Sequence, residues 1–199
     1  MIIVGITGSL GSGKSTVASY FSLRGAKVVD ADKIVHRLLR FDTTLAERLV
    51  ESFGKEIINS KGSIDRKKLA EIGFRNFYQW RALCKIIHPE VIKIIKEMIK
   101  KARKQKIKVL VIDAPLLIES GLNKLVDYTV LVKAKRRDAY QRAKIKLGIS
   151  REDFRRRIRF QFPFSKKLPY ADFVIDNSKT LRITERQVDE IWKKIIKKR

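Results

Sequence analysis

Five short apolar runs alternate along the chain with longer segments in which apolar positions recur every three or four residues. The runs contain few polar residues, as is typical of strands that are covered on both faces. They span residues 2–6, 27–29, 108–113, 128–132 and 173–176. Alternating strands and helices are typical of a doubly wound α/β domain. The pattern therefore predicts a three-layer α/β fold with a five-stranded parallel sheet.

Helical spacing continues from the second run to about residue 105 and is interrupted at His88 and Pro89. The residue before a proline avoids the helical region, and proline suits a first helical turn. One helix is therefore predicted to end near Ile87 and another to begin near Pro89. This second helix and the C-terminal helix carry apolar stripes that predict core-facing sides: Val91, Ile95, Met98 and Ala102; Val188, Ile191, Trp192, Ile195 and Ile196.

Residues 8–15, Gly-Ser-Leu-Gly-Ser-Gly-Lys-Ser, form a complete phosphate-binding pattern between the first strand and a helix. Its glycines let consecutive N–H groups point into one concavity at a helix N-terminus, which attracts anions. Lys14 would reach the outer phosphates, and the Ser15 hydroxyl would bind Mg²⁺. The pattern predicts that the chain binds a nucleoside triphosphate through a set of neighbouring residues: Gly8, Gly11, Ser12, Gly13, Lys14, Ser15 and Thr16.

The composition adds a large positive charge. The 199 residues include 46 Lys and Arg against 21 Asp and Glu, a net charge of +25. A basic surface attracts polyanions such as nucleotides or nucleic acid, and a lysine-rich solvated surface is an equally good interpretation. The single cysteine, Cys84, excludes an intrachain disulfide, and no apolar run approaches the about 20 residues of a membrane span. We therefore expect a cytoplasmic protein.

Two carboxylates follow the second strand, at Asp30 and Asp32. Residues two apart in an extended segment point the same way, so one carboxylate would face an acceptor hydroxyl while the other supports the Mg²⁺ water shell. A well-placed base contributes roughly 10²–10⁴-fold to a rate. The alternative is a solvent-exposed turn, where aspartate is common.

Asp113 ends the third strand, where a carboxylate that supports Mg²⁺ is expected in this class of fold. A motor ATPase commonly has a second acid at the next position, and this chain has Ala114. The combination of Asp113 with Ala114 favours transfer of phosphate to an acceptor over hydrolysis. A capping or turn role for Asp113 is the alternative.

Residues 133–167 form a very basic region, in which Arg142 and Lys146 lie four apart on a predicted helix that ends at Gly148. Side chains at this spacing share one helix face and would neutralise charge that develops during transfer. A solvated basic face is the alternative. His36 and His88 lack partners at metal-ligand spacing, so no zinc site is predicted.

In their order along the chain, these motifs resemble the dephospho-CoA kinase family. Asp-Ala-Asp at 30–32, Pro-Leu-Leu-Ile-Glu at 115–119 and Ala-Asp-Phe-Val-Ile-Asp-Asn at 171–177 are more specific than the phosphate pattern alone. Residues 62–69, His88-Pro89 and Gln161 extend the resemblance to nearly the whole chain.

The resemblance implies transfer of the γ-phosphate of ATP to the ribose 3′-hydroxyl of dephospho-CoA, giving CoA and ADP. It also implies a P-loop kinase unit similar to the nucleoside monophosphate kinases. Three parts are expected within it: a core of residues 1–35, 107–132 and 170–199, a helical CoA-substrate region of residues 36–106, and a lid region of residues 133–169.

Residue roles follow from the matching positions. Asp32, Lys14 and Arg142 are the expected catalytic residues, and Ser15 and Asp113 the expected Mg²⁺ ligands. Asn177 falls where the family contacts the nucleotide base. Lys146 stands where the family usually has a second arginine, and lysine lacks the bidentate fork. The resemblance also implies a set of substrate-binding residues: Asp32, Arg66, His88, Pro115 and Leu116.

Two other functions compete with this interpretation. A P-loop kinase for another small hydroxyl acceptor, such as a nucleoside or nucleotide, would share the phosphate pattern but not residues 30–32 and 115–119. An RNA- or DNA-binding NTPase is suggested by charge alone, and the basic segments lack the interleaved aromatic residues that stacking on bases requires.

Overall fold

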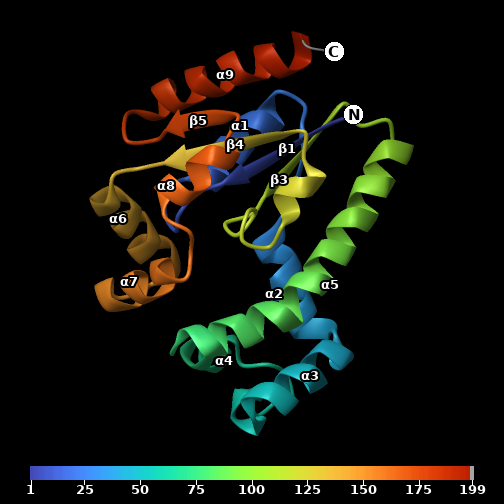
Figure 1. Ribbon diagram of the computed structural model, residues 1–199, viewed down its shortest axis with the longest axis vertical. Coiled ribbons are helices and arrows are strands. Elements are labelled where there is room, and N and C mark those ends of the chain that lie inside the picture. Colours follow the sequence, from blue (N-terminus) through green and yellow to red (C-terminus); the bar gives the residue numbers. More distant parts are fainter. Residues whose placement is uncertain (198–199) are drawn as a thin grey trace. The chain divides into compact units, whose positions relative to one another are not determined.

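The computed structural model describes residues 1–197. Contacts within the chain divide it into two compact units, Met1–Asp30 with residues 99 onward, and Ala31–Met98. Figure 1 shows the elements of both, and each unit is described by itself.

The first unit is built on a five-stranded sheet in the order β2-β3-β1-β4-β5, with every neighbouring pair parallel. The strands are β1 (Ile2–Thr7), β2 (Lys27–Asp30), β3 (Val109–Asp113), β4 (Tyr128–Lys133) and β5 (Phe173–Asp176). β1, β3 and β4 are almost entirely buried, whereas the edge strands β2 and β5 are partly exposed. The predicted fold class, an α/β fold with a five-stranded parallel sheet, is confirmed.

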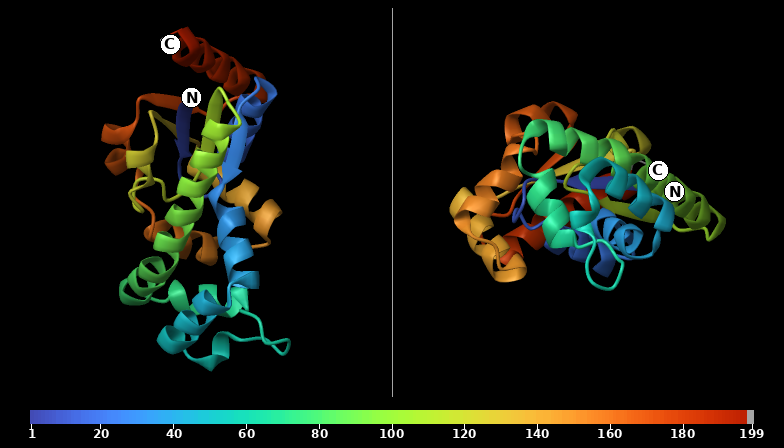
Figure 2. Two further views of the ribbon diagram at one scale, coloured as in Figure 1. Left: turned by 90° about the vertical axis from the view of Figure 1, so that its right-hand side faces the viewer. Right: turned by 90° about the horizontal axis from the view of Figure 1, so that it is seen from below.

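Two helices pack together over this sheet, α1 (Lys14–Leu23) and α9 (Leu181–Lys197). In Figure 1 α9 lies next to β5, which it contacts, whereas α1 contacts β1; Figure 2 shows the same helices from two further sides. Arg24, at the end of α1, donates to Asp189 of α9 at 2.7 Å. The core between helices and sheet contains aliphatic and aromatic side chains that are nearly inaccessible: Val4, Ile6, Val17, Phe21, Val111, Val130, Ile175, Val188 and Ile195.

A basic helical segment connects β4 to β5 in the same unit. It consists of α6 (Arg136–Leu147), α7 (Arg151–Arg159), α8 (Phe164–Lys167) and the 3-10 turn η3 (Leu168–Tyr170). Gly148 ends α6 in the left-handed conformation with φ 62°, and the Ser150 hydroxyl accepts from Asp153 N–H to begin α7. A second 3-10 turn, η2 (Leu122–Leu125), precedes β4.

The second unit is helical. α2 (Ala31–Phe41), α3 (Thr43–Phe53), the 3-10 turn η1 (Lys55–Ile57) and α4 (Arg66–Gly73) lead into α5 (Phe77–Lys104). Asp42 and Asp65 cap α3 and α4 by accepting main-chain N–H bonds at their starts. Leucine and phenylalanine side chains of these helices, such as Leu45, Leu49 and Phe53 of α3, are buried within the unit.

The predicted helix break at His88-Pro89 is wrong, because α5 runs without interruption through Pro89. A proline inside a helix costs about 3 kcal/mol, since it cannot donate to the carbonyl four residues earlier. The apolar stripe on both sides of Pro89 outweighs that cost, because burying one large aliphatic side chain contributes about 1.5–3 kcal/mol. The side chains of its members are at most 9% exposed: Leu83, Ile86, Ile87, Val91, Ile95, Ile99 and Ala102.

The expected extended segment at Asp30 and Asp32 is also wrong. β2 ends at Asp30, and α2 begins at Ala31, so the two carboxylates stand on different elements. The alternation rule for strands therefore does not apply to them. Asp32 lies instead in the first turn of a helix, where the helix dipole favours a carboxylate.

Candidate nucleotide-binding site

The phosphate loop, residues 8–15, follows β1 and enters α1. Gly11 and Gly13 hold φ values of 75° and 93°, which favour glycine. Leu10 N–H is bonded to the Gln161 side chain, and Ser12 N–H to the Ser9 carbonyl. Within residues 1–197, no acceptor is found for four further N–H groups of the loop and first helical turn, those of Gly11, Gly13, Ser15 and Thr16. Such groups bind an anion at a helix N-terminus.

The loop is held from outside by two segments that lie far along the chain. A Cβ added to Gly11 would come within 2.0 Å of the Ala139 carbonyl on α6, and one added to Gly13 within 1.9 Å of Asn177 Nδ2. The positions therefore require glycine for space as well as for conformation. The loop shape is fixed by tertiary packing before any ligand arrives.

Lys14 has its ammonium group against the loop. Nζ donates to the carbonyls of Gly8 at 3.1 Å and Ser9 at 3.2 Å, and the residue is 9% exposed. The Lys14 ammonium group therefore lies against the main chain of the phosphate loop. Its predicted contact with the outer phosphates stays a prediction.

Asn177, directly after β5, supports the phosphate loop. It is 2% exposed, and its Nδ2 donates to the Ser12 carbonyl at 2.8 Å while its Oδ1 accepts from Thr184 at 2.8 Å. Arg142, on α6, donates to the Asn177 carbonyl at 3.1 Å and lies 3.5 Å from the Ser12 carbonyl. The structure thus joins Arg142 and Asn177 to the loop. The predicted base contact of Asn177 stays a prediction.

The carboxylate before Asn177 is held in its charged form. Asp176 accepts from Ser178 N–H at 2.9 Å and lies 3.3 Å from the ammonium group of Lys133. The hydrogen bonding from Ser178, with help from Lys133, lowers the pKa of Asp176 below its ordinary value of 3.8.

Asp113 ends β3 next to the strand that carries the phosphate loop. It lies in register with Ile6 of β1 and with Asp30 of β2, and it is 6% exposed. The N–H of Ala114 donates to the Ile6 carbonyl at 3.0 Å, which ties the end of β3 to β1. Residues 1–197 contain no group of three or more His, Cys, Asp or Glu that would hold a metal by themselves.

The predicted acceptor-side residues are spread over both units. Asp32, Arg66 and His88 belong to the second unit, whereas Pro115 and Leu116 follow β3 in the first. In the second unit the Arg66 guanidinium donates to His36 Nε2, which places the ring proton of His36 on Nδ1. Asp32 is exposed in the first turn of α2, and His88 is half-buried in α5.

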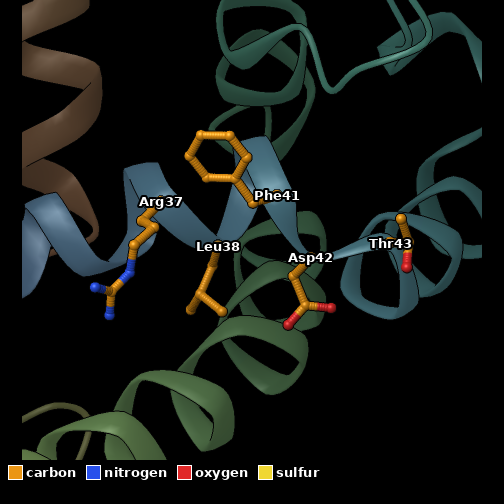
Figure 3. A pocket seen from close by; sticks show the side chains of 5 residues that line it. All are labelled: Arg37, Leu38, Phe41, Asp42 and Thr43. Carbon is orange, nitrogen blue, oxygen red and sulfur yellow. The ribbon is translucent and has the colours of Figure 1, made fainter.

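The second unit also has a shallow pocket of about 410 Å³ at the junction of α2 and α3. Figure 3 shows Leu38 and Asp42 on one side of the ribbon and the Phe41 ring on the other, with the Arg37 guanidinium at the edge. Arg40 lies over the Phe41 ring at 4.9 Å. This pocket was not among the predicted sites, and it combines a cation, a carboxylate and apolar carbon within the predicted CoA-substrate region.

Sequence reasoning assigned no site role to a buried lysine beneath the phosphate loop. Lys167, at the end of α8, is 1% exposed and contacts Thr7, Pro115 and Glu119. Burial lowers the pKa of Lys167 from its ordinary value of 10.5, although Glu119 acts in the opposite direction. No signal in the sequence separates Lys167 from the exposed Lys166 beside it.

The parallel sheet, the glycine loop between β1 and α1, and the lysine against that loop define a P-loop nucleotide-binding protein of the kinase type. A family model described as dephospho-CoA kinase matches residues 2–182. The chain therefore belongs to the dephospho-CoA kinase family, as its motifs predict.

Individual relatives agree with the family match. A dephospho-CoA kinase of Aquifex aeolicus is 40% identical over 192 residues, which cover 96% of each chain. One of Dehalococcoides mccartyi is 39% identical over 89% of each chain. The solved structure of a dephospho-CoA kinase from Campylobacter jejuni superposes with a TM-score of 0.70 at 26% identity, covering 97% of this chain and 96% of that one.

Proposed function

We propose that the protein transfers the γ-phosphate of ATP to the ribose 3′-hydroxyl of dephospho-CoA, giving CoA and ADP. The observation that carries the proposal is a formed phosphate loop in a chain that matches the dephospho-CoA kinase model over residues 2–182. ATP is the phosphate donor and dephospho-CoA the acceptor.

The phosphate loop supplies the donor side of the site. The N–H groups of Gly11, Gly13 and Ser15 bind phosphate oxygens, and Lys14 turns from the Gly8 and Ser9 carbonyls toward the γ-phosphate. Mg²⁺, when bound with ATP, neutralises charge on the phosphates. The Ser15 hydroxyl and the Asp113 carboxylate would hold it, because both are hard oxygen donors of the kind that magnesium prefers.

Asp32 is the proposed general base. As the acceptor oxygen forms its bond to the γ-phosphorus, the bond from that phosphorus to the bridging oxygen of ADP breaks, and the hydroxyl proton passes to the Asp32 carboxylate. Arg142, already bonded beside Ser12, neutralises charge that develops on the transferred group. Arg66, His88, Pro115 and Leu116 are the proposed contacts of the acceptor.

Within residues 1–197, no helix has the length and apolar character needed to cross a bilayer. A cytoplasmic location is part of the proposal, because a single cysteine suits a reducing compartment.

The proposal is tested by coupled measurement of ADP formation with Mg-ATP and either dephospho-CoA, adenosine or AMP as acceptor. We expect turnover with dephospho-CoA at least about a hundredfold above the other two, since discrimination between substrates that differ in bonded groups reaches this range. The Lys14→Ala variant, checked for its fold by circular dichroism, is expected to form no ADP above background. Turnover with adenosine or AMP that exceeds turnover with dephospho-CoA would favour the other kind of kinase.

A further inference from the structure

A buried ammonium group joins three separate segments behind the phosphate loop. Lys167 Nζ donates to the Thr7 hydroxyl at 3.1 Å, to the Pro115 carbonyl at 2.6 Å and to the Glu119 carboxylate at 3.0 Å. An ammonium group has three donors, and all three are used here. Lys167 is therefore committed to the protein and does not serve as a ligand for phosphate.

The partners of Lys167 lie at the two strand ends that flank the donor site. Thr7 ends β1 and is followed at once by the phosphate loop, and Pro115 comes two residues after Asp113. The Thr7 hydroxyl also donates to the Pro115 carbonyl, at 3.1 Å. The spacing between the loop and the Asp113 strand end is therefore set by contacts that meet at one ammonium group.

The same network reaches the segment that returns from α7 to β5. Glu119 accepts from Phe162 N–H at 2.8 Å, and the neighbouring Gln161 accepts from Leu10 N–H, inside the phosphate loop, at 3.0 Å. The segment of residues 161–167 thus contacts the loop at Leu10, the last residue of β1 at Thr7, and the residues after β3 at Pro115 and Glu119. One segment therefore connects the ends of β1 and β3.

A contribution to stability does not by itself explain the ion pair between Lys167 and Glu119. The side chains of Lys167 and Glu119 are 1% and 10% exposed, and removing charges from water costs about as much as their attraction returns. The buried ion pair is therefore weak evidence for a stabilising role.

We propose that Lys167 and Glu119 are positioning residues that hold the phosphate loop and the Asp113 strand end at the separation needed for phosphoryl transfer. The effect on turnover rests on the proposed function, whereas the effect on nucleotide binding does not. Since a displacement of about 1 Å can lower a rate about 10²-fold, loss of this network slows transfer even when the protein stays folded.

The experiment separates positioning from stability with four variants. Lys167→Met leaves Glu119 buried without its cation and is expected to lower the melting temperature. Adding Glu119→Gln removes that orphaned charge and keeps an acceptor for Phe162 N–H, so most of the stability returns. Lys166→Met, at the exposed neighbour, is the matched control. Thr7→Val removes the link between Lys167 and the end of β1, directly before the loop, with little change in volume.

Circular dichroism first establishes conditions under which every variant is folded. Under those conditions we measure turnover, the KM for each substrate and the dissociation constant of a nonhydrolysable ATP analogue. We expect the double variant and Thr7→Val to lose at least about tenfold in turnover and to bind the analogue more weakly, with the control at wild-type values. Turnover of either variant within about twofold of wild type overturns the proposal.

A failure of the proposed function is distinguishable from a failure of this inference. Wild-type protein that binds the ATP analogue but does not phosphorylate dephospho-CoA refutes the function. The affinities of the double variant and of Thr7→Val for the analogue then decide the positioning role: wild-type affinity rejects it, and at least about tenfold weaker binding supports it.

Discussion

Asn177 allows a sharp test of what shapes the phosphate loop. The variant Asn177→Ala removes the bond from Nδ2 to the Ser12 carbonyl and the acceptor of the Thr184 hydroxyl. The Ser12 carbonyl then keeps only the 3.5 Å contact with Arg142, which is long for a hydrogen bond. A residue whose only role is to contact the nucleotide base would not, when replaced, leave a main-chain carbonyl of the loop without its hydrogen-bond donor.

The size of the effect follows from those contacts. The lost bond from the Thr184 hydroxyl contributes about 1 kcal/mol, and the Ser12 carbonyl without its Asn177 donor costs about 1–3 kcal/mol. We expect the free energy of unfolding to fall by about 2–4 kcal/mol. For a chain of this length, each kcal/mol lowers the melting temperature by about 2–4 °C, so the loss is roughly 5–15 °C.

The assay compares two ligands that share phosphates and differ in the base. Calorimetry with ATP and with inorganic tripolyphosphate is expected to show both affinities reduced by similar factors in Asn177→Ala, because the loop binds phosphate in either case. Asn123→Ala, a half-buried asparagine in η2, is the control and is expected to match wild type. Unchanged tripolyphosphate affinity and melting temperature, with the affinity for ATP alone reduced, would refute the loop-support role and favour a base contact.

Three further predictions concern chemistry and pH. Asp32→Asn is expected to lower turnover about 10²–10⁴-fold while the KM for ATP stays within a few-fold, in steady-state kinetics; full turnover would remove Asp32 from the reaction. Arg142→Ala is expected to slow transfer at least about tenfold more than Arg155→Ala on the exposed face of α7, and equal rates would contradict the lid role. Because the pKa of Asp176 is lowered in the folded state, its charge stabilises the fold above the ordinary pKa of 3.8, and this contribution is lost as pH falls below that value. Denaturant unfolding should therefore show wild type more stable than Asp176→Asn at neutral pH, with the difference shrinking as the pH falls below 3.8; a constant difference would contradict the assignment.

The strands and the phosphate loop were predictable because their signals are local. A buried strand, a glycine-rich turn and a helix that follow one another within residues 2–23 leave little choice of structure. The order of the strands in the sheet and the contacts that support the loop were not predicted, because they join residues more than a hundred positions apart, such as Leu10 and Gln161.

The errors arose where tertiary packing outweighed local preference. Pro89 disfavours a helix interior, yet burial of the surrounding apolar stripe keeps α5 continuous. Asp32 was placed on an extended segment, because a strand end and a first helical turn tolerate the same residue. The burial of Lys167 was not predicted, because Lys167 lies in a basic run in which buried and solvent-exposed lysines have similar sequence neighbours.

The most direct test of the account is the chemical identity of the product. Purified protein is incubated with Mg-ATP and dephospho-CoA, and the product is analysed by mass spectrometry and phosphorus NMR. The account predicts that dephospho-CoA gains one phosphate as a monoester on the ribose 3′-oxygen, with one ADP formed per CoA. ADP release without a new phosphoester, or a phosphate on any other oxygen, would contradict it.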